Sequence, residues 1–523
     1  MRTFGTGTRQ TSWGILLIAL ALFSHPVVAA LPELAESGQK AALIAALEQG
    51  ENVNERSADG TSALHWAVYQ GDLDLAERLI ASGAEVNMAN AFGATPLSTA
   101  AIDANADIIR LLLEAGAAAD ARNEDNETAL MIAARAGSVD TVRLLLAHGA
   151  DVNAAELMAG QTSLMWAAAH RHPEVVRVLL DAGADVDAIS TFHDWPRIVT
   201  AEPRIKTLHD GGFTALLFAA REGCRECVVD LLRAGADIDK TDPWGVTPLV
   251  LALLNMNFDT AATLVEQGAD VDRWDWWGRT PLYAAIDLNT LPQGSRPDLP
   301  STDTLTALDL ARLLLEYGAD PNIRLKKEPP ARGGTGDRGQ LEGSTDGYVL
   351  TTGATALHRA AKASDDAAIR LLLDHGADVN IPNQIWGITP ILVAAGVGHI
   401  LGNFAEHPSR GAFKTDTQAL ATVSLLQQAG ADILAHDKRG FTAAHGAAEM
   451  GWSATLQYLY EQGVALDAVA LNPDRLLPGG SYTYRVPVAF PRPGPEDHWT
   501  PLEMALNEGH TEVADLIRKL LAQ

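Results

Sequence analysis

The sequence is poor in basic residues, in cysteine and in aromatic residues. Its 523 residues include 39 lysines and arginines against 66 aspartates and glutamates, which gives a formal net charge of -27. Phosphates and anionic lipid headgroups repel such a chain, so we expect no nucleic acid partner. Two cysteines allow at most one disulfide. Aromatic residues make up only 6%, so any place where they cluster is informative.

Motifs of enzymes and cofactor-binding proteins are missing as well. There is no phosphate-binding loop, no zinc-protease His-Glu pair and no Gly-x-Ser-x-Gly elbow. The stretch GTGDRG at Gly334–Gly339 matches Gly-x-Gly-x-x-Gly, but it follows KKEPPARG and no helix opens after it. We therefore expect no catalytic residues, no cofactor and no metal site.

Residues 1–30 have the layout of a secretory signal peptide. They begin with basic residues, continue with an apolar run from Trp13 to Phe23, and end with Ala29 and Ala30. This layout predicts cleavage after Ala30 and export of the chain, either to the periplasm or as a secreted protein. The run is short for a bilayer span, and no later stretch approaches that length, so we expect no membrane contact after signal removal. An uncleaved anchor is the alternative.

Two phrases recur along the rest of the chain. One is Gly-Ala-Asp-Val-Asn, and the other is Gly-x-Thr-(Pro/Ala/Ser)-Leu, with steps of 33 or 34 residues wherever no insertion intervenes. A period of this length is typical of repeat arrays, in which each unit stacks on its neighbours. The third position of the second phrase falls at Ser62, Thr95, Thr128, Thr162, Thr214, Thr247, Thr280, Thr355, Thr389, Thr442 and Thr500.

The repeat is clearest in GTSALHWAVYQGDLDLAERLIASGAEVN and GATALHRAAKASDDAAIRLLLDHGADVN. These stretches match the Thr-Pro-Leu-His…Gly-Ala-Asp-Val-Asn pattern, so the chain resembles the ankyrin repeat family over essentially its whole length after residue 30. The resemblance implies an all-α repeat fold, an ankyrin solenoid of helix-turn-helix units with β-hairpin fingers. It also implies that the fingers and first helices line a concave face, the usual binding side of the family.

The residues favour the same structure without the family name. After each Thr comes a short apolar stretch, then a turn, and then a Leu-rich amphipathic run such as VRLLLAHGA. The Thr can cap the first helix, Pro fits its first turn, and Gly supplies the left-handed position that ends the second helix. One helix pair cannot bury its own apolar face, so it must stack on its neighbours.

The distances between the two phrases predict where the chain departs from the regular repeat. We expect helix-turn insertions at 288–305 and 400–417 and extended fingers at 188–210, 323–351 and 468–497. The remaining segments are the signal peptide at 1–30, an N-terminal capping half-repeat at 31–54, repeat blocks at 55–187, 211–322 and 352–467, and a C-terminal capping repeat at 498–523.

Four aromatic residues share one position of the finger, immediately before the turn glycine. When the fingers are aligned, Trp277 of DRWDWWG falls opposite Trp244 of DKTDPWG, and Phe92 and Trp386 occupy the same slot. An aromatic residue that recurs at one slot of a module predicts a structural role, in which finger packs on finger.

Other aromatic residues have no such structural slot. Trp274 and Trp276 align with Thr241 and Pro243, so nothing in the module requires them. Exposed Trp and Tyr dominate binding hot spots, and we predict partner contacts for these two tryptophans. Local packing of an enlarged finger is the alternative. Three aromatic residues of the extended fingers are further partner-binding candidates: Trp195, Tyr482 and Tyr484.

The first helices contribute a mixed surface to the expected groove, without a stripe of one charge. Its partner-binding candidates are Tyr69 and Arg221. Such a surface is more typical of a groove that binds a protein or peptide than of a small-molecule pocket.

The two cysteines, Cys224 and Cys227, open the second helix of the Thr214 repeat. Their spacing allows a local disulfide in an oxidising compartment. Inert thiols are an alternative, and a redox site is a third interpretation, although thioredoxin-like enzymes need a different fold around such a pair.

The function that these features predict is non-covalent binding of another protein or peptide through groove and fingers, with basic partners favoured by the acidic chain. Two alternatives stay open: an enzymatic or stress-protection activity built by the long loops, and a secreted effector directed at a host. The sequence does not determine the oligomeric state.

Overall fold

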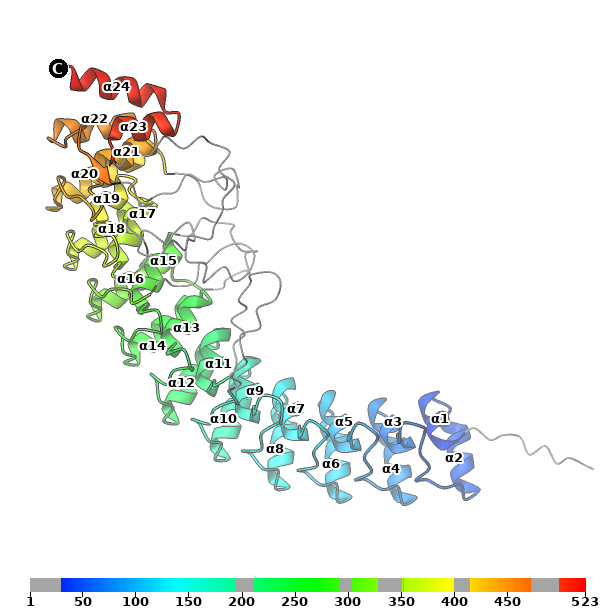
Figure 1. Cartoon of the computed structure of the whole chain (residues 1–523). Helices are drawn as coiled ribbons and strands as arrows, with labels where there is room; N and C mark the ends of the chain where they lie inside the picture. The colour runs from blue at the N-terminus through cyan, green and yellow to red at the C-terminus, as the bar shows by residue number, and fades with distance from the viewer. Residues whose placement is uncertain are drawn as a thin grey trace, which may run out of the picture.

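The computed structural model describes residues 30–192, 211–290, 303–327, 350, 352–398, 414–471 and 498–523. These residues form twelve helix pairs and one short two-stranded sheet. The pairs stack side by side into a curved array with α1 at one end and α24 at the other (Figure 1). This is the all-α ankyrin solenoid that the sequence predicts.

The odd-numbered helices lie on the inner side of the curve and the even-numbered helices on its outer side (Figure 1). The inner row consists of α1 (Leu31–Glu36), α3 (Ala63–Tyr69), α5 (Pro96–Ile102), α7 (Ala129–Ala136), α9 (Ser163–Ala169), α11 (Ala215–Glu222), α13 (Pro248–Leu254), α15 (Pro281–Asn289), α17 (Ala356–Ala363), α19 (Pro390–Ala394), α21 (Ala443–Glu449) and α23 (Pro501–Asn507). The outer row consists of α2 (Lys40–Glu48), α4 (Leu73–Ala81), α6 (Ala106–Glu114), α8 (Val139–Ala147), α10 (Pro173–Asp181), α12 (Arg225–Arg233), α14 (Phe258–Glu266), α16 (Ala307–Glu316), α18 (Asp366–Asp374), α20 (Asp416–Gln428), α22 (Ser453–Glu461) and α24 (Thr511–Leu521).

The inner helices from α3 onward all start at the repeated phrase, whose third residue is the N-cap in each case. Before α5, for example, the Thr95 hydroxyl accepts the backbone N–H of Ser98, and Pro96 occupies the first turn. Gly268, just after α14, has a φ of 92°, a left-handed conformation that costs other residues energy. The repeated phrases therefore mark the helix ends.

The N-terminal segment differs from its expected form. Residues 31–54, expected as a capping half-repeat, contain both α1 and α2. α1 packs against α3 as the inner helices of other repeats do, and Leu31 and Leu43 are fully buried. The segment lacks the Gly-x-Thr phrase, but it is long enough for two short helices that cover the end of the core.

The array continues past the irregular segments. α9 packs against α11 although residues 193–210 separate them in sequence, and α15 packs against α17 although residues 328–349 lie between them. The predicted insertions and extended fingers lie largely outside the described residues, apart from their ends: α15 extends to Asn289 and α20 begins at Asp416. Buried leucines and alanines form one continuous core between the two rows.

Buried histidines tie adjacent repeats together. The Nδ1 atom of each ring accepts the backbone N–H of its own N-cap residue, and Nε2 therefore carries the proton and donates to a carbonyl of the next repeat at 3.0–3.1 Å. Burial lowers the pKa of each ring, to about 4 in two of them. The pairs of histidine and carbonyl are His65 with Ala94, His358 with Ile388, and His445 with Trp499.

A second bridge between repeats lies at the last residue of the Gly-Ala-Asp-Val-Asn phrase. Asn322 donates from its amide to the Gly376 carbonyl oxygen at 3.0 Å and accepts the backbone N–H of Asp378 at 2.8 Å. Asp239 and Asp272 stand at the same position and accept the corresponding N–H. Burial raises the pKa of both carboxyl groups. An ionised aspartate has no proton for the glycine carbonyl, so it makes only half of the bridge.

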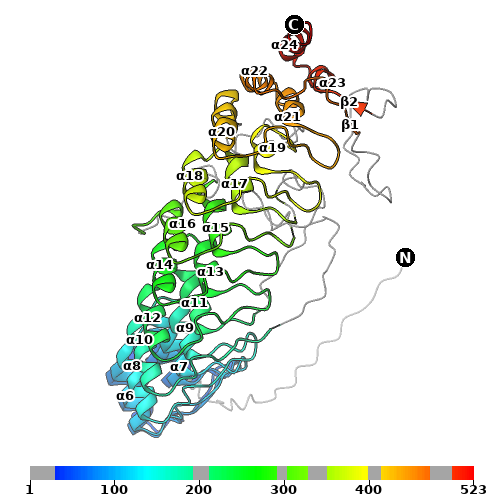
Figure 2. The same ribbon diagram turned by 90° about the vertical axis from the view of Figure 1, so that its left-hand side faces the viewer.

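The fingers leave the array on the side of the inner row (Figure 2). Within the described residues they contain isolated β-bridges, such as Arg56 with Ser62, and one antiparallel pair of strands, β1 (Ala470–Leu471) with β2 (His498–Trp499). The strands join the two ends of the extended finger predicted at 468–497. Among the described helices, none combines the length and the apolar character that a bilayer crossing requires.

Candidate functional site

The tips of two adjacent fingers carry the tryptophans that the sequence analysis singles out. Each tip is shaped by an aspartate: Asp242 Oδ1 accepts the backbone N–H of Trp244 and Val246, both at 2.8 Å. Asp275 Oδ1 accepts the backbone N–H of Trp277 and Arg279, both at 3.0 Å. Because both tips use the same turn, Trp244 and Trp277 occupy equivalent places in successive repeats.

Trp244 and Trp277 form the contact between fingers that the alignment predicts. Their ring centroids are 6.2 Å apart with an angle of 24° between the planes, a stacked arrangement. The backbone N–H of Trp276 donates to the Trp244 carbonyl at 2.8 Å, which joins the two tips directly.

A buried ion pair stiffens the second tip. Asp275 and Arg279 are almost fully buried, and Asp275 Oδ2 accepts hydrogen bonds from Arg279 Nε at 2.9 Å and from its terminal NH2 group at 2.7 Å. The guanidinium lies 5.6 Å from the centroid of the Trp277 ring. The carboxylate therefore shapes the turn with one oxygen and holds the arginine with the other.

Trp274 and Trp276 remain largely exposed, at 44% and 52% of their surface. Lys326 Nζ lies 2.9 Å from the centroid of Trp274, and Lys327 Nζ lies 3.8 Å from that of Trp276. The backbone N–H groups of both lysines donate to the Trp277 carbonyl, at 2.9 and 3.1 Å. We call these four side chains, Trp274, Trp276, Lys326 and Lys327, the tryptophan–lysine patch. Its tryptophans contact neighbouring side chains but are not part of the core.

Trp386 and Phe92, which share the finger position of Trp244 and Trp277, differ in burial. Trp386 is 8% exposed, and the Arg439 guanidinium lies 5.0 Å from its ring centroid, so it packs as expected. Phe92 is 66% exposed, and the expectation of a packed ring is wrong there. The next finger presents the backbone of Asn123 and Glu124 beside Gly93, and no described aromatic ring or guanidinium covers Phe92.

The two groove candidates differ in how much surface they offer. Tyr69 is 60% exposed and touches Trp66 edge-on at 5.8 Å between ring centroids. Arg221 pairs with Glu222 at 2.7 Å, and its guanidinium lies 5.0 Å from the centroid of Phe218. Tyr69 is thus an open contact surface, whereas interactions within the chain already engage Arg221.

The inner row also contains two tryptophans at equivalent positions, which the sequence pattern did not bring out. Trp66 and Trp166 occupy the fourth position after the N-cap in α3 and α9, and their Nε1 atoms are buried without a hydrogen-bond partner. The Arg135 guanidinium lies 5.3 Å from the Trp166 centroid, and His170 stacks on the same ring at 5.8 Å. Alignment of the inner helices shows the shared slot and could have identified both tryptophans.

Two titratable groups near the C-terminal end of the inner row have shifted pKa values. Burial lowers the pKa of Lys414 to about 7, and its Nζ donates to the Ala361 carbonyl at 3.0 Å. Burial and the neighbouring Glu508 raise the pKa of Glu449 to about 8. Within the described part of the chain, no hydrogen bond or ion pair joins Lys414 to Glu449. Both shifts reduce the charge that these two side chains carry at neutral pH.

The two cysteines form a disulfide, with Cα atoms 5.2 Å apart. Cys224 is the N-cap of α12, and both residues are buried, at 3% and 0% exposure. The bond therefore lies buried where α11 meets α12. Trp195, Tyr482 and Tyr484 lie outside the described residues.

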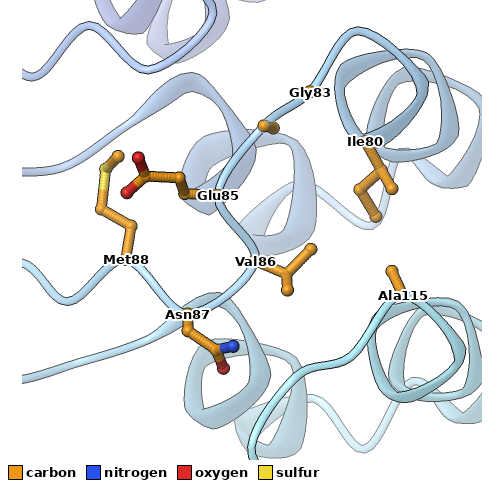
Figure 3. A pocket seen from close by; sticks show the side chains of 8 residues that line it. Ile80, Gly83, Glu85, Val86, Asn87, Met88 and Ala115 are labelled. Carbon is orange, nitrogen blue, oxygen red and sulfur yellow. The ribbon is translucent and has the colours of Figure 1, made fainter.

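One hollow among the described residues lacks the titratable side chains that are typical of an enzymatic site. This hollow of about 430 Å³ lies between α4, the following turn and the end of α6 (Figure 3). Glu85 is the only titratable side chain that lines it, and its neighbours there include Ile80, Val86, Asn87 and Met88. No group of three or more His, Cys, Asp or Glu side chains in the described ranges could hold a metal ion.

Comparison with known proteins agrees with this architecture. The family model for ankyrin repeats in three copies matches residues 31–123, 107–190 and 216–324, and the model for a single ankyrin repeat matches residues 352–384. A solved structure, the human ASB11 ankyrin repeat domain, is 27% identical, covering 46% of this chain and 98% of that chain with a TM-score of 0.37. No curated protein matches the chain.

The matched stretches together cover more than half of the 523 residues. Ankyrin repeats generally mediate contacts between proteins, and the fold is typically a non-catalytic interaction scaffold. The chain belongs to the ankyrin repeat family.

Proposed function

We propose that this chain is an exported scaffold that binds another protein or peptide through its concave groove and its fingers, and that it does so without catalysis. The observation that carries the proposal is the exposure of Trp274 and Trp276, at 44% and 52%, on fingertips fixed by hydrogen bonds. Large exposed aromatic side chains on a rigid support are typical of binding hot spots.

The rigidity of the stacked repeats favours binding through these exposed side chains. The stacked repeats share one core, and the histidine bridges connect three of the inner helices, α3, α17 and α21, to the next finger. A preformed surface loses little conformational entropy on association, so more of the contact energy appears as affinity. Tyr69 extends the exposed aromatic surface toward the N-terminal part of the groove.

The charge of the chain favours a partner with net positive charge. At -27, the molecule attracts basic proteins over long range and repels polyanions. We therefore propose a basic protein or peptide as the partner and no nucleic acid.

The position of α1 and the disulfide support the proposal of export. α1 begins at Leu31, the residue that would follow the predicted cut, and the Leu31 backbone N–H donates to Glu55 Oε2 at 3.2 Å. Cleavage after Ala30 would turn this N–H into an ammonium group beside a carboxylate, which is a favourable pair. The disulfide between Cys224 and Cys227 also suits an oxidising compartment.

The binding proposal is tested by affinity capture from the exported fraction of the source cells. The immobilised wild-type chain is compared with a Trp274→Ala/Trp276→Ala double variant. The matched control is Tyr317→Ala, which removes an equally exposed aromatic ring, at 51%, from the outer row. We expect the same partner on the wild type and on the control, and a strong loss on the double variant.

Equal recovery of the partner by all three proteins would show that the fingertip tryptophans are not the binding site. Recovery of no specific partner, or turnover of a substrate by the purified chain, would reject the scaffold proposal itself. Export is tested separately by mass spectrometry of the chain in the exported fraction, where we expect the N-terminus at Leu31.

A further inference from the structure

The tryptophan–lysine patch is positively charged on a strongly acidic molecule. Lys326 and Lys327 are both exposed, and no described carboxylate lies within ion-pair distance of either Nζ. The carboxylate of the fingertip, Asp275, is fully buried and has both oxygens engaged, by backbone N–H groups and by Arg279. Among the described residues, these two ammonium groups therefore have no carboxylate partner, on a chain with a net charge of -27.

The two ammonium groups are held in place by contacts on two sides. Their backbone N–H groups donate to the Trp277 carbonyl, and Leu325, directly before them, exchanges hydrogen bonds with Ala354 and Gly353 at 2.8 and 2.7 Å. The indole faces of Trp274 and Trp276 attract the Nζ atoms electrostatically. A lysine ammonium has three donors, so one that lies over a ring still has N–H groups free for an anion.

The patch also has an apolar part, because the indoles of Trp274 and Trp276 are exposed at 44% and 52%. A fully matched ligand would therefore place carboxylates against the lysines and apolar side chains against the rings.

We propose that the tryptophan–lysine patch binds an acidic segment of the partner protein, in which carboxylates lie beside apolar or aromatic side chains. This inference rests on the proposed function and adds the chemistry of one contact. The net charge of the chain governs long-range approach, which favours a basic partner, whereas the patch selects a short acidic segment within it. A polyanion such as a membrane surface fits poorly, because it would face the remaining negative charge as well.

The test uses the full-length exported chain and a fluorescent ten-residue peptide that alternates Phe and Glu. Two further peptides replace every Glu with Gln or with Lys. Fluorescence polarisation measures binding to the wild type, to Lys326→Glu/Lys327→Glu, and to a control with the same charge change on exposed residues of the outer row, Arg312→Glu/Arg370→Glu. A milder Lys326→Gln/Lys327→Gln variant and circular dichroism separate loss of binding from loss of folding.

We expect the Glu peptide to bind the wild type and the outer-row control with similar affinity. Its affinity for Lys326→Glu/Lys327→Glu should fall by about tenfold or more, since two attractions become repulsions. Added salt should weaken binding to the wild type, and the Gln and Lys peptides should bind more weakly than the Glu peptide.

Equal binding of the Glu peptide to the folded lysine variants and to the wild type overturns the inference, as does stronger binding of the Gln or Lys peptide. Lysine-dependent binding of phosphatidylglycerol vesicles in place of the peptide overturns it as well. Capture of the natural partner separates the two proposals. If the wild type and both lysine variants capture it equally, the scaffold function stands and only the role of the patch fails.

Discussion

His358 Nε2 lies 3.0 Å from the carbonyl oxygen of Ile388, thirty residues further along the chain. The ring thereby connects the start of α17 to the finger that leads into α19. Its Nδ1 accepts the backbone N–H of Thr355 at 3.1 Å, so the bridge requires the neutral ring with its proton on Nε2. His445 makes the same bridge to Trp499.

Acid should weaken the array through these two histidines. Burial lowers the pKa of each to about 4, while in the unfolded chain it is about 6.5. Above pH 6.5 both states are neutral; between pH 6.5 and 4 only the unfolded chain takes up the proton, so stability falls as pH falls. The loss should reach about 3 kcal/mol per histidine near pH 4. Urea unfolding at pH 7.5, 5.5 and 4.5 measures it.

The control for acid sensitivity is His358→Gln, which lacks the titrating ring but keeps the carboxylates that also protonate near pH 4. This variant should be less stable at pH 7.5 and should lose less stability between pH 7.5 and 5.5. A pH dependence identical to that of the wild type would contradict the assignment.

Replacement of Asp239 or Asp272 with Asn should stabilise the chain. The amide can accept the N–H that the carboxylate accepts now and can also donate to the glycine carbonyl, as Asn322 does. We expect a gain of about 1 kcal/mol for each change at pH 7, measured by urea unfolding. The pKa of an aspartate in the unfolded chain is about 3.8, and burial raises the pKa of both carboxyl groups in the folded chain. In the wild type these groups therefore destabilise the fold increasingly as pH rises from 3.8 to above the pKa of the folded state. The gain should therefore shrink at acid pH.

The reverse change supplies the control for the aspartate substitutions. Asn322→Asp removes the amide donor to the Gly376 carbonyl, so it should destabilise the chain by a similar amount. Loss of stability in Asp239→Asn and Asp272→Asn would mean that a second hydrogen bond, from a side-chain amide to the glycine carbonyl, does not stabilise these turns.

Removal of Arg279 should loosen the tip that carries the tryptophan–lysine patch. Arg279→Leu leaves the fully buried Asp275 carboxylate without its partner, and we expect a loss of about 3 kcal/mol. The Trp277 ring also loses its guanidinium neighbour, so tryptophan fluorescence should shift toward that of exposed indole. The exposed Arg273→Leu, six positions earlier, is the control and should change stability by less than about 0.5 kcal/mol. Equal stabilities of the two variants would contradict a structural role for the buried pair.

Reduction of the disulfide should have a modest effect. The bond between Cys224 and Cys227 closes a very short loop, so chain entropy accounts for only about 2 kcal/mol. Thermal unfolding with and without reductant should show a correspondingly small decrease in melting temperature. A Cys224→Ala/Cys227→Ala variant should unfold identically in both conditions. A wild-type chain insensitive to reductant would indicate that the bond contributes nothing to stability.

Much of the fold was predictable because its determinants are local and recur. The Thr of the phrase is the N-cap residue of each inner helix from α5 to α23, and its hydroxyl accepts a cap bond that spans only three residues in α5, α7, α9, α11, α13, α15 and α23. The stack of Trp244 on Trp277 was predictable for a related reason: equivalent residues of adjacent repeats lie side by side. The same reasoning was wrong for Phe92, which stays exposed, and the next finger presents the backbone of Asn123 and Glu124 beside the adjoining Gly93.

The candidate site was predictable only in part. The sequence singled out Trp274 and Trp276 because the module does not require them, but it gave no sign that Lys326 and Lys327 lie over their rings. About fifty residues separate these partners in the chain, including a helix pair with irregular spacing. Such a contact depends on how successive fingers are offset, which the twist and curvature of the whole array decide.

The sequence by itself determined the repeat, its register, the helix ends and the charge of the molecule, because short-range hydrogen bonds and periodic apolar residues encode them. Only the tertiary structure decided which side chains share a surface: that Arg221 is already paired, that Asp275 is buried against Arg279, and that two lysines meet two exposed tryptophans. These contacts join different layers of the stack, and their geometry follows from packing between layers, for which no local pattern exists.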